Sequence, residues 1–407
     1  MKNTAIVFIS IVITLAIFDI TAYLLLPTSL AKTFSAYRVS SEHRTVTWQI
    51  SRGYPRYYFV ADPELGFDIA PNAKGLHSGD DYHYEVFSNA AGCFDQNPPT
   101  LYATSDYYYF AGDSFTWGYS PYDKKFATIF EKRSGIPSAK CGVTHTGTLH
   151  QYGKFKRFTQ LTGRYPAAVL AGFFPNDIAN DFAHPHTTVI DGYQVNTKIL
   201  DAKNQRIISL SIAEAETKYR AIVDQKRRES QSTWSLLKQY SLLANMAKEI
   251  RKRIVSILPD GHDTTGTSSD TEFYGITPGL KKALGYDNLA LTQVNRGALV
   301  TWKADSIENN YRLVILLIPD KYSFKNIRYF DGLKDFLDSI SVDYLDLAVV
   351  FHTGNHDVSE IYLPNDGHFS ENGNLVVANA LIEYFAPGQI SSQRSKPDQP
   401  VPARKAD

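Results

Sequence analysis

The sequence predicts an α/β fold of three layers, in which helices cover both faces of a parallel sheet. Short apolar runs alternate with helix-compatible stretches along most of the chain, and such alternation favours a parallel sheet. Runs such as LVILLIP are apolar throughout, as strands buried on both faces require. The expected strands are Tyr107–Ala111, Lys140–Val143, Ala167–Phe174, Arg312–Ile318 and Val342–Leu347.

The first thirty residues predict a membrane anchor. The apolar run TAIVFISIVITLAIFDITAYLLL, residues 4–26, is long enough to cross a bilayer as a helix. It is longer than the apolar core of a signal peptide and has no convincing small-residue cleavage site, so we expect residues 1–30 to remain in the inner membrane. Asp19 interrupts the run, either as an interfacial carboxyl of a tilted helix or at a contact with another membrane protein.

Residues 31–60 are polar and mixed, and they predict a stalk before a folded domain at residues 61–386. The domain begins with loop-rich sequence from Asp62, in the pieces DPELGF, PNAKG and SNAAGCFD. The gaps between the later strands hold helix-compatible sequence. Helices are expected at Tyr122–Arg133, Gly153–Leu161, Leu291–Glu308, Phe324–Ile340 and Glu371–Phe385.

One insertion, at about residues 181–287, interrupts this alternation. It holds two helical patterns, Ile212–Arg228 and Trp234–Leu258, and it either shapes access to a ligand or only elaborates the structure. The polar stretch 261–272 and the tail 387–407 have no apolar pattern, and we expect both to be disordered.

Charge and cysteine content narrow the function class. Lys plus Arg number 42 and Asp plus Glu number 42, so the basic excess typical of a nucleic-acid binder is missing, and no nucleic-acid partner is expected. The two cysteines, Cys93 and Cys141, either form one disulfide outside the cytoplasm or remain two buried thiols.

Three segments place reactive side chains at the carboxyl ends of predicted strands, where ligands bind in open α/β sheets. Gly-Asp-Ser follows the first strand, and its glycine lets the chain turn tightly so that Ser114 is presented before a helix. The segment GFFPNDIAND follows the third strand and supplies Asn176. The segment LPNDGHFSENG follows the last strand and places Asp366 and His368 two residues apart.

Together these side chains are the parts of a serine-nucleophile site. A serine needs a base that takes its proton, a carboxylate that orients the imidazole, and donors for the developing oxyanion. Ser114 alone could equally be a helix-capping serine. Its occurrence together with Asn176 and His368 favours the nucleophile.

These motifs resemble those of the SGNH or GDSL hydrolases over about residues 62–385, with the insertion as a gap. The resemblance makes Ser114 in GDSFTWG the nucleophile and an oxyanion donor through its N–H, and Asn176 in PNDI a second oxyanion donor. It makes His368 in DGHF the base and Asp366 its partner. The family implies a flavodoxin-like strand order, and its activities range from esterase and lipase to carbohydrate O-acetyl transfer. The pieces DPELGF, PN and NAAG also resemble the lead-in of membrane-anchored bacterial members.

Two positions depart from the family pattern. The family spaces Asp and His as D-x-x-H, whereas here the spacing is D-x-H and Asn365 occupies the usual Asp position. The orienting residue is therefore Asp366, which we favour, or Asn365. In GVTHTGTLHQY, His145 stands where the family commonly has glycine. Gly147 follows two residues later, and we favour it as the third oxyanion donor on residue type. Any non-proline N–H can serve, so the change at His145 does not abolish the oxyanion hole.

No cofactor and no metal are expected. Loop histidines without nearby cysteines or an H-E-x-x-H helix are more often solvated than ligands. The histidines interpreted in this way are His184, His186, His352 and His356. Asp177 and Asp181 are expected to cap the chain that leaves the third strand rather than to act in catalysis.

Three functions remain open at this point. The first is a membrane-anchored esterase that releases a short acyl group, such as acetyl, from a carbohydrate or small-molecule ester through an acyl-enzyme on Ser114. The second is an O-acyltransferase that passes the acyl group to a glycan hydroxyl, fed by a membrane acyl carrier near Asp19. The third is a non-catalytic glycan-binding module. The anchor, the cysteine pair and the resemblance together predict a catalytic domain outside the cytoplasm, in the periplasm.

Overall fold

The computed structural model describes five stretches of the chain and six helical positions between residues 10 and 21; the stretches are 53–79, 81–182, 184–201, 206–230 and 293–386. Within these residues, no helix is both long enough and apolar enough to cross a membrane. Most of the predicted anchor at 4–26 lies outside the described residues, as do the stalk up to residue 52, the expected helix Trp234–Leu258, the stretch 261–272 and the tail 387–407.

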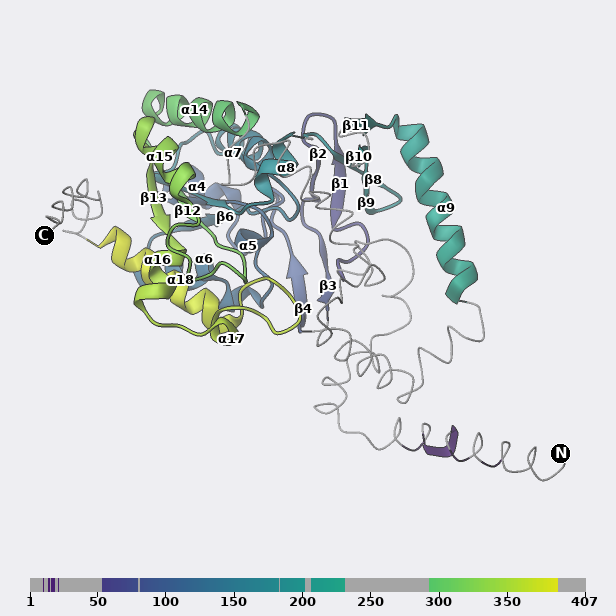
Figure 1. Ribbon diagram of the computed structural model, residues 1–407. Coiled ribbons are helices and arrows are strands. Elements are labelled where there is room, and N and C mark those ends of the chain that lie inside the picture. Colours follow the sequence, from purple (N-terminus) through teal and green to yellow (C-terminus); the bar gives the residue numbers. More distant parts are fainter. Residues whose placement is uncertain are drawn as a thin grey trace, which may run out of the picture.

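The centre of the domain is a parallel sheet of five strands in the order β13-β12-β7-β5-β6 (Figure 1). Counted along the chain, this is the order 2-1-3-4-5 read from the β6 edge, which is flavodoxin-like, as the resemblance implied. The strands are β5 (Tyr108–Ala111), β6 (Ser138–Lys140), β7 (Ala168–Phe173), β12 (Arg312–Leu317) and β13 (Asp343–Asp346). All five lie at the predicted runs, although β6 begins two residues earlier than expected and ends at Lys140.

Side chains at alternate positions of the central strands belong to two separate apolar cores. On one face, side chains such as Tyr109 and Val169 pack beneath one set of helices, and on the other face Phe110 and Leu170 pack beneath a second set. The first face carries α4 (Pro99–Thr104), α7 (Thr148–Thr162), α14 (Gln293–Glu308) and α15 (Asp331–Ser339). The second carries α6 (Phe126–Ser134), α16 (Leu347–Thr353) and α18 (Glu371–Phe385). The three-layer prediction is thus confirmed.

The lead-in segment is a pair of antiparallel hairpins, and the expectation of loops there is wrong. The hairpins are β1 (Phe59–Asp62) with β2 (Gly66–Ile69), and β3 (Lys74–Ser78) with β4 (His83–Phe87). The stalk boundary at residue 60 is also wrong, because Tyr54, Tyr58 and Phe59 are buried in a third core, which consists largely of aromatic side chains. That core also contains Trp117 and Tyr119, so the hairpins pack directly beneath the segment after Ser114.

The start of the insertion consists of strands that the sequence reasoning missed. After α8 (Asp177–Phe182), the hairpin β8 (Thr187–Ile190) with β9 (Tyr193–Asn196) is followed by β10 (Lys198–Asp201) with β11 (Arg206–Ser209). The strand β8 lies against β1 and β2. The helix α9 (Ile212–Ser230) confirms the first of the two expected helices.

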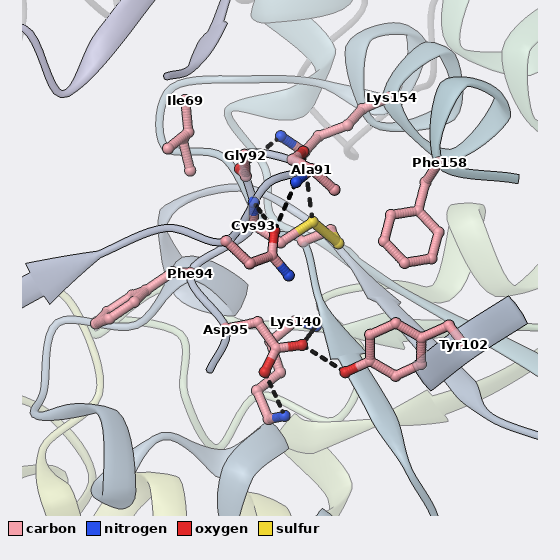
Figure 2. The surroundings of a disulfide bond; sticks show 12 residues. Ile69, Ala91, Gly92, Cys93, Phe94, Asp95, Tyr102, Lys140, Lys154 and Phe158 are labelled. Atoms are coloured by element: carbon pink, nitrogen blue, oxygen red, sulfur yellow. Dashed lines mark hydrogen bonds and ion pairs between the residues drawn. A yellow bond between two sulfur atoms is a disulfide. The ribbon is translucent and has the colours of Figure 1, made fainter. Parts of the chain in front are cut away.

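Cys93 and Cys141 form a disulfide, which settles the choice that the sequence left open. It joins the segment after the hairpins to the residue that follows β6, across a sequence separation of 48. Figure 2 shows Tyr102 and Phe158 beside it. Close by, the buried Lys140 ammonium forms an ion pair with Asp95 at 3.1 Å. The disulfide therefore fixes the lead-in to the edge of the sheet.

Candidate active site

Ser114 begins a short helix directly after the first strand of the sheet, as predicted. The helix α5 (Ser114–Trp117) follows β5 through Gly112 and Asp113. Gly112 has φ 148°, and a Cβ there would lie 2.0 Å from Thr116 Oγ1, so the turn requires glycine. The helix cap is Asp113, whose carboxylate accepts from Phe115 N at 2.9 Å. The alternative of Ser114 as the cap is therefore wrong.

The serine hydroxyl instead meets His368. Ser114 Oγ lies 2.7 Å from His368 Nε2. On the other side of the ring, His368 Nδ1 hydrogen-bonds to Asp366 Oδ1, which also accepts from the His368 backbone N at 3.0 Å. Ser114 and His368 are only 7% and 8% exposed. A hydroxyl, an imidazole and a carboxylate thus form one chain of hydrogen bonds, in the arrangement of a serine triad.

The loop that carries Asp366 and His368 is held by two charged residues that the sequence reasoning missed. Asn365 donates to Asp81 through its backbone N at 2.7 Å and through Nδ2 at 2.8 Å. Lys321 Nζ donates to the carbonyl oxygens of Leu363 at 2.5 Å, Pro364 at 2.9 Å and Asp366 at 3.4 Å. The structure therefore pairs Asn365 with Asp81 and His368 with Asp366.

Asn176 reaches the nucleophile turn from the end of β7. It is buried between β7 and α8, and its side chain lies close enough to the Asp113 carboxylate to lower the pKa of that group. Burial raises the pKa of Asp113, while the N–H of Phe115 and the Asn176 amide oppose that rise. An amide carries two N–H donors, the type of group that serves an oxyanion.

Gly147 directly precedes α7, where a side chain has no room. A Cβ on Gly147 would lie 2.4 Å from Asp181 Oδ1. Asp181 accepts from Leu149 N at 2.8 Å and from Asn295 Nδ2 at 2.6 Å, and its burial raises its pKa to about 7. It therefore caps α7 rather than its own chain, which corrects the expected role. Asp177, the first residue of α8, accepts from Gln151 Nε2 at 3.1 Å.

The interpretation of the loop histidines as solvated is wrong for two of them. His186 is buried and His184 largely so, and burial lowers their pKa values to about 3 and about 4. The His186 ring lies 5.1 Å from that of His145, which has φ 67°. His352 is exposed, as expected. Across the described stretches, no group of three His, Cys, Asp or Glu side chains is arranged to hold a metal ion.

An aromatic side chain that the sequence reasoning also missed lies on the imidazole. The ring of Tyr119 stacks on that of His368 with centroids 3.7 Å apart and an interplanar angle of 1°. Phe115 contacts the same imidazole at 4.7 Å and 38°. The sequence signal for Tyr119 was its place in the segment GDSFTWGYS, but nothing in the sequence pointed to Asp81 or Lys321.

The strand order and the Ser114–His368–Asp366 geometry agree with the arrangement that the resemblance to SGNH hydrolases implied. No family model matches the sequence. No curated protein matches it either.

Several solved structures are similar in part. A lipolytic protein of the G-D-S-L family from Desulfitobacterium hafniense DCB-2 has 10% identity and a TM-score of 0.34, covering 68% of this chain and 99% of that one. A D191A mutant of the acetylxylan esterase Axe2 from Geobacillus stearothermophilus has 10% identity and a TM-score of 0.33, covering 72% and 97%. Axe2 itself has 8% identity and a TM-score of 0.32, covering 68% and 93%. Similarity at this level carries no argument about function.

Proposed function

We propose that this protein is a serine esterase of the SGNH type, which removes a short acyl group from a carbohydrate or small-molecule ester through an acyl-enzyme on Ser114. The observation that carries the proposal is the 2.7 Å contact between Ser114 Oγ and His368 Nε2, with Asp366 on the opposite ring nitrogen. Each group has the partner that its role requires.

Acylation follows from this geometry. His368 Nε2 accepts the Ser114 proton as Oγ attacks the ester carbonyl carbon and forms a tetrahedral intermediate. Asp366 keeps the proton of the neutral ring on Nδ1 and stabilises the imidazolium that forms. When the intermediate collapses, the C–O bond to the alcohol breaks, and the imidazolium gives its proton to the leaving oxygen. Water then attacks the acyl-serine with the same base, which releases the acid and restores Ser114.

The oxyanion of the intermediate needs donors that are already in place. The Ser114 N–H lies at the first position of α5, where a backbone N–H has no acceptor within the helix. Asn176 lies close to the carboxylate of Asp113, the residue directly before Ser114. We propose these two groups as donors, with Gly147 N–H as the third.

The low solvent exposure of Ser114 and His368 favours a short acyl group in the substrate. Less than a tenth of the surface of Ser114 or His368 is exposed, so a small group such as acetyl fits beside the nucleophile with the least rearrangement. The Cys93–Cys141 disulfide favours an oxidising compartment, because such bonds persist outside the cytoplasm. With the apolar run at residues 4–26, it supports our proposal of a membrane-anchored enzyme that works in the periplasm.

The test is hydrolysis of 4-nitrophenyl acetate by the purified full chain and by Ser114→Ala, with detergent present throughout. We expect Ser114→Ala to lose more than about a thousandfold in kcat, while its thermal unfolding midpoint stays near that of the parent because Ser114 does not cap the helix. Mass spectrometry should find an acetyl adduct on Ser114 when turnover is quenched early. A Ser114→Ala protein with parental turnover would refute the proposal.

The same assay separates hydrolysis from transfer. With a methyl glycoside added as acceptor, an esterase yields acetate at an unchanged rate. An acetylated glycoside as the main product would instead identify an acyltransferase. Absence of both turnover and adduct, across esters of different acyl length, would leave the glycan-binding function.

A further inference from the structure

The imidazole of His368 contacts two aromatic rings. Tyr119 covers one side in an almost perfectly parallel stack, at 3.7 Å between centroids, and Phe115 contacts it in a tilted arrangement at 4.7 Å. Neither contact uses a ring nitrogen, because Nε2 meets Ser114 and Nδ1 meets Asp366. The stack therefore fixes the plane of the ring, while the hydrogen bonds fix its rotation within that plane.

Side chains of the hairpin segment contact Tyr119 and hold its ring in place. Its hydroxyl hydrogen-bonds to that of Tyr54, and its ring makes edge contacts with His77 at 4.9 Å and Tyr82 at 5.0 Å. Tyr54 precedes β1, His77 belongs to β3 and Tyr82 precedes β4. The hairpin segment thus supports the ring that supports the imidazole.

The chemistry of the proposed reaction gives this stack a role beyond packing. When His368 takes the Ser114 proton, a positive charge forms on a ring whose face lies against the π-electrons of Tyr119. A cation over an aromatic face is stabilised, and most strongly where water is excluded. Tyr119 is 4% exposed, so the contact is a dry one.

We propose that Tyr119 is a positioning residue for His368: its ring holds the imidazole in the plane that joins Ser114 to Asp366, and its π-face stabilises the imidazolium. This inference rests on the proposed esterase function. It gives the hairpin side chains that contact Tyr119 an indirect part in the reaction, although no atom of Tyr119 has to touch the substrate.

The first test compares Tyr119→Phe with Tyr119→Leu in the purified full chain. Tyr119→Phe keeps the stacked ring and loses the hydroxyl that contacts Tyr54, so kcat should stay within about threefold of the parent. Tyr119→Leu removes the ring, and kcat should fall about 30-fold, which corresponds to about 2 kcal/mol. KM should change little in both, because the imidazolium exists only beyond the ground state. Reaction of Ser114 with a fluorophosphonate should slow in parallel with kcat.

Tyr122→Leu is the matched control. Tyr122 lies three residues further on, and its ring packs on Phe87 and Phe94 rather than on His368. It should lose stability and retain kcat. If both leucine variants lose turnover in proportion to their loss of thermal stability, Tyr119 is a packing residue only and the proposal is overturned.

A second series does not depend on the leucine variant folding. Tyr119 is replaced by phenylalanine and then by phenylalanines with one, three and five ring fluorines, which keep the ring in place while they withdraw electrons from its face. We expect kcat to fall stepwise along the series, and a flat series would exclude stabilisation of the imidazolium. If Ser114→Ala also retained turnover, the esterase proposal itself would fail. A flat series with Ser114 essential would remove only the electrostatic part of the role of Tyr119, and the comparison of Tyr119→Phe with Tyr119→Leu would then decide the positioning part.

Discussion

The most informative single change is Asp366→Asn, because it alters one atom of the loop in which the sequence departs from the family pattern. Asp366 Oδ1 accepts two hydrogen bonds, from His368 Nδ1 and from the His368 backbone N. An asparagine has the same shape, so the loop should keep its conformation. It lacks the negative charge in either orientation of its amide. In the orientation with the amide N toward the ring, it also donates to Nδ1 and places the proton of the neutral ring on Nε2, where it blocks proton transfer from Ser114.

Two effects add in this variant. The side chains of His368 and Asp366 are 10% and 13% exposed, so their pair is shielded from most solvent. Charges about 4 Å apart at an effective dielectric constant of about 20 attract by about 4 kcal/mol, which corresponds to roughly a thousandfold in rate. The wrong tautomer lowers the competent fraction further, and the corresponding change in triad enzymes costs about 10⁴-fold in kcat. We therefore expect a loss of 10³- to 10⁴-fold with little change in KM.

The assay is steady-state hydrolysis of 4-nitrophenyl acetate, with intact sites counted by fluorophosphonate labelling over long times. Asn365→Ala is the control, because Asn365 is the neighbouring residue and binds Asp81 instead of the imidazole. It should retain turnover within about tenfold, since its backbone N–H still reaches Asp81. Parental turnover in Asp366→Asn, or a larger loss in Asn365→Ala, would refute the reasoning.

Three further predictions concern other parts of the domain. Asn176→Ala should lower kcat by about 10²- to 10³-fold with a small change in KM, whereas a change confined to KM would make Asn176 a substrate-binding residue. Replacing Cys93 and Cys141 together by alanine should lower the urea-derived free energy of unfolding by about 4 kcal/mol, from the loop-closure entropy for the separation of 48 residues. A parental protein whose free energy of unfolding is the same with and without reductant would contradict this. Burial raises the pKa of Asp181 to about 7 from 3.8, so its stabilising contribution is complete below about pH 4 and is lost as the pH rises through about 7. Asp181→Asn should make the free energy of unfolding decline less steeply between pH 5 and pH 8. Equal slopes in the parent and the variant would contradict a raised pKa of Asp181.

The parallel sheet could be predicted because its strands have a distinctive composition. A strand such as β12, buried on both faces, is apolar at nearly every position, and β12 and the other, less uniformly apolar runs alternate with helical sequence. The lead-in hairpins gave no such signal. Their strands are four or five residues long, and charged residues such as Asp62 and Glu85 interrupt them. What makes them fold is an aromatic core contributed by distant segments, and local sequence does not reveal that core.

The site divides in the same way. The residues that carry the proposed chemistry lie in short motifs at strand ends, so Ser114, Asn176 and His368 could be located from the sequence. The residues that hold them in place could not. Asp81 lies 284 residues from Asn365 in the chain, and a lysine such as Lys321 differs from other surface lysines only through the three carbonyl groups that it contacts.

These supporting contacts explain how the shortened D-x-H spacing can form a triad. With one residue fewer between the carboxylate and the imidazole, the loop has to turn so that Asp366 folds back onto the ring of a residue only two positions ahead. A flexible loop would pay conformational entropy for that turn. Here Asp81 holds the loop from the side of the hairpins and Lys321 from the side of β12, and both act largely on backbone groups. These neighbours therefore support the turn together with the loop's own hydrogen bond from His368 N to Asp366 Oδ1, and the hairpin segment contributes to the candidate site as well as to the scaffold.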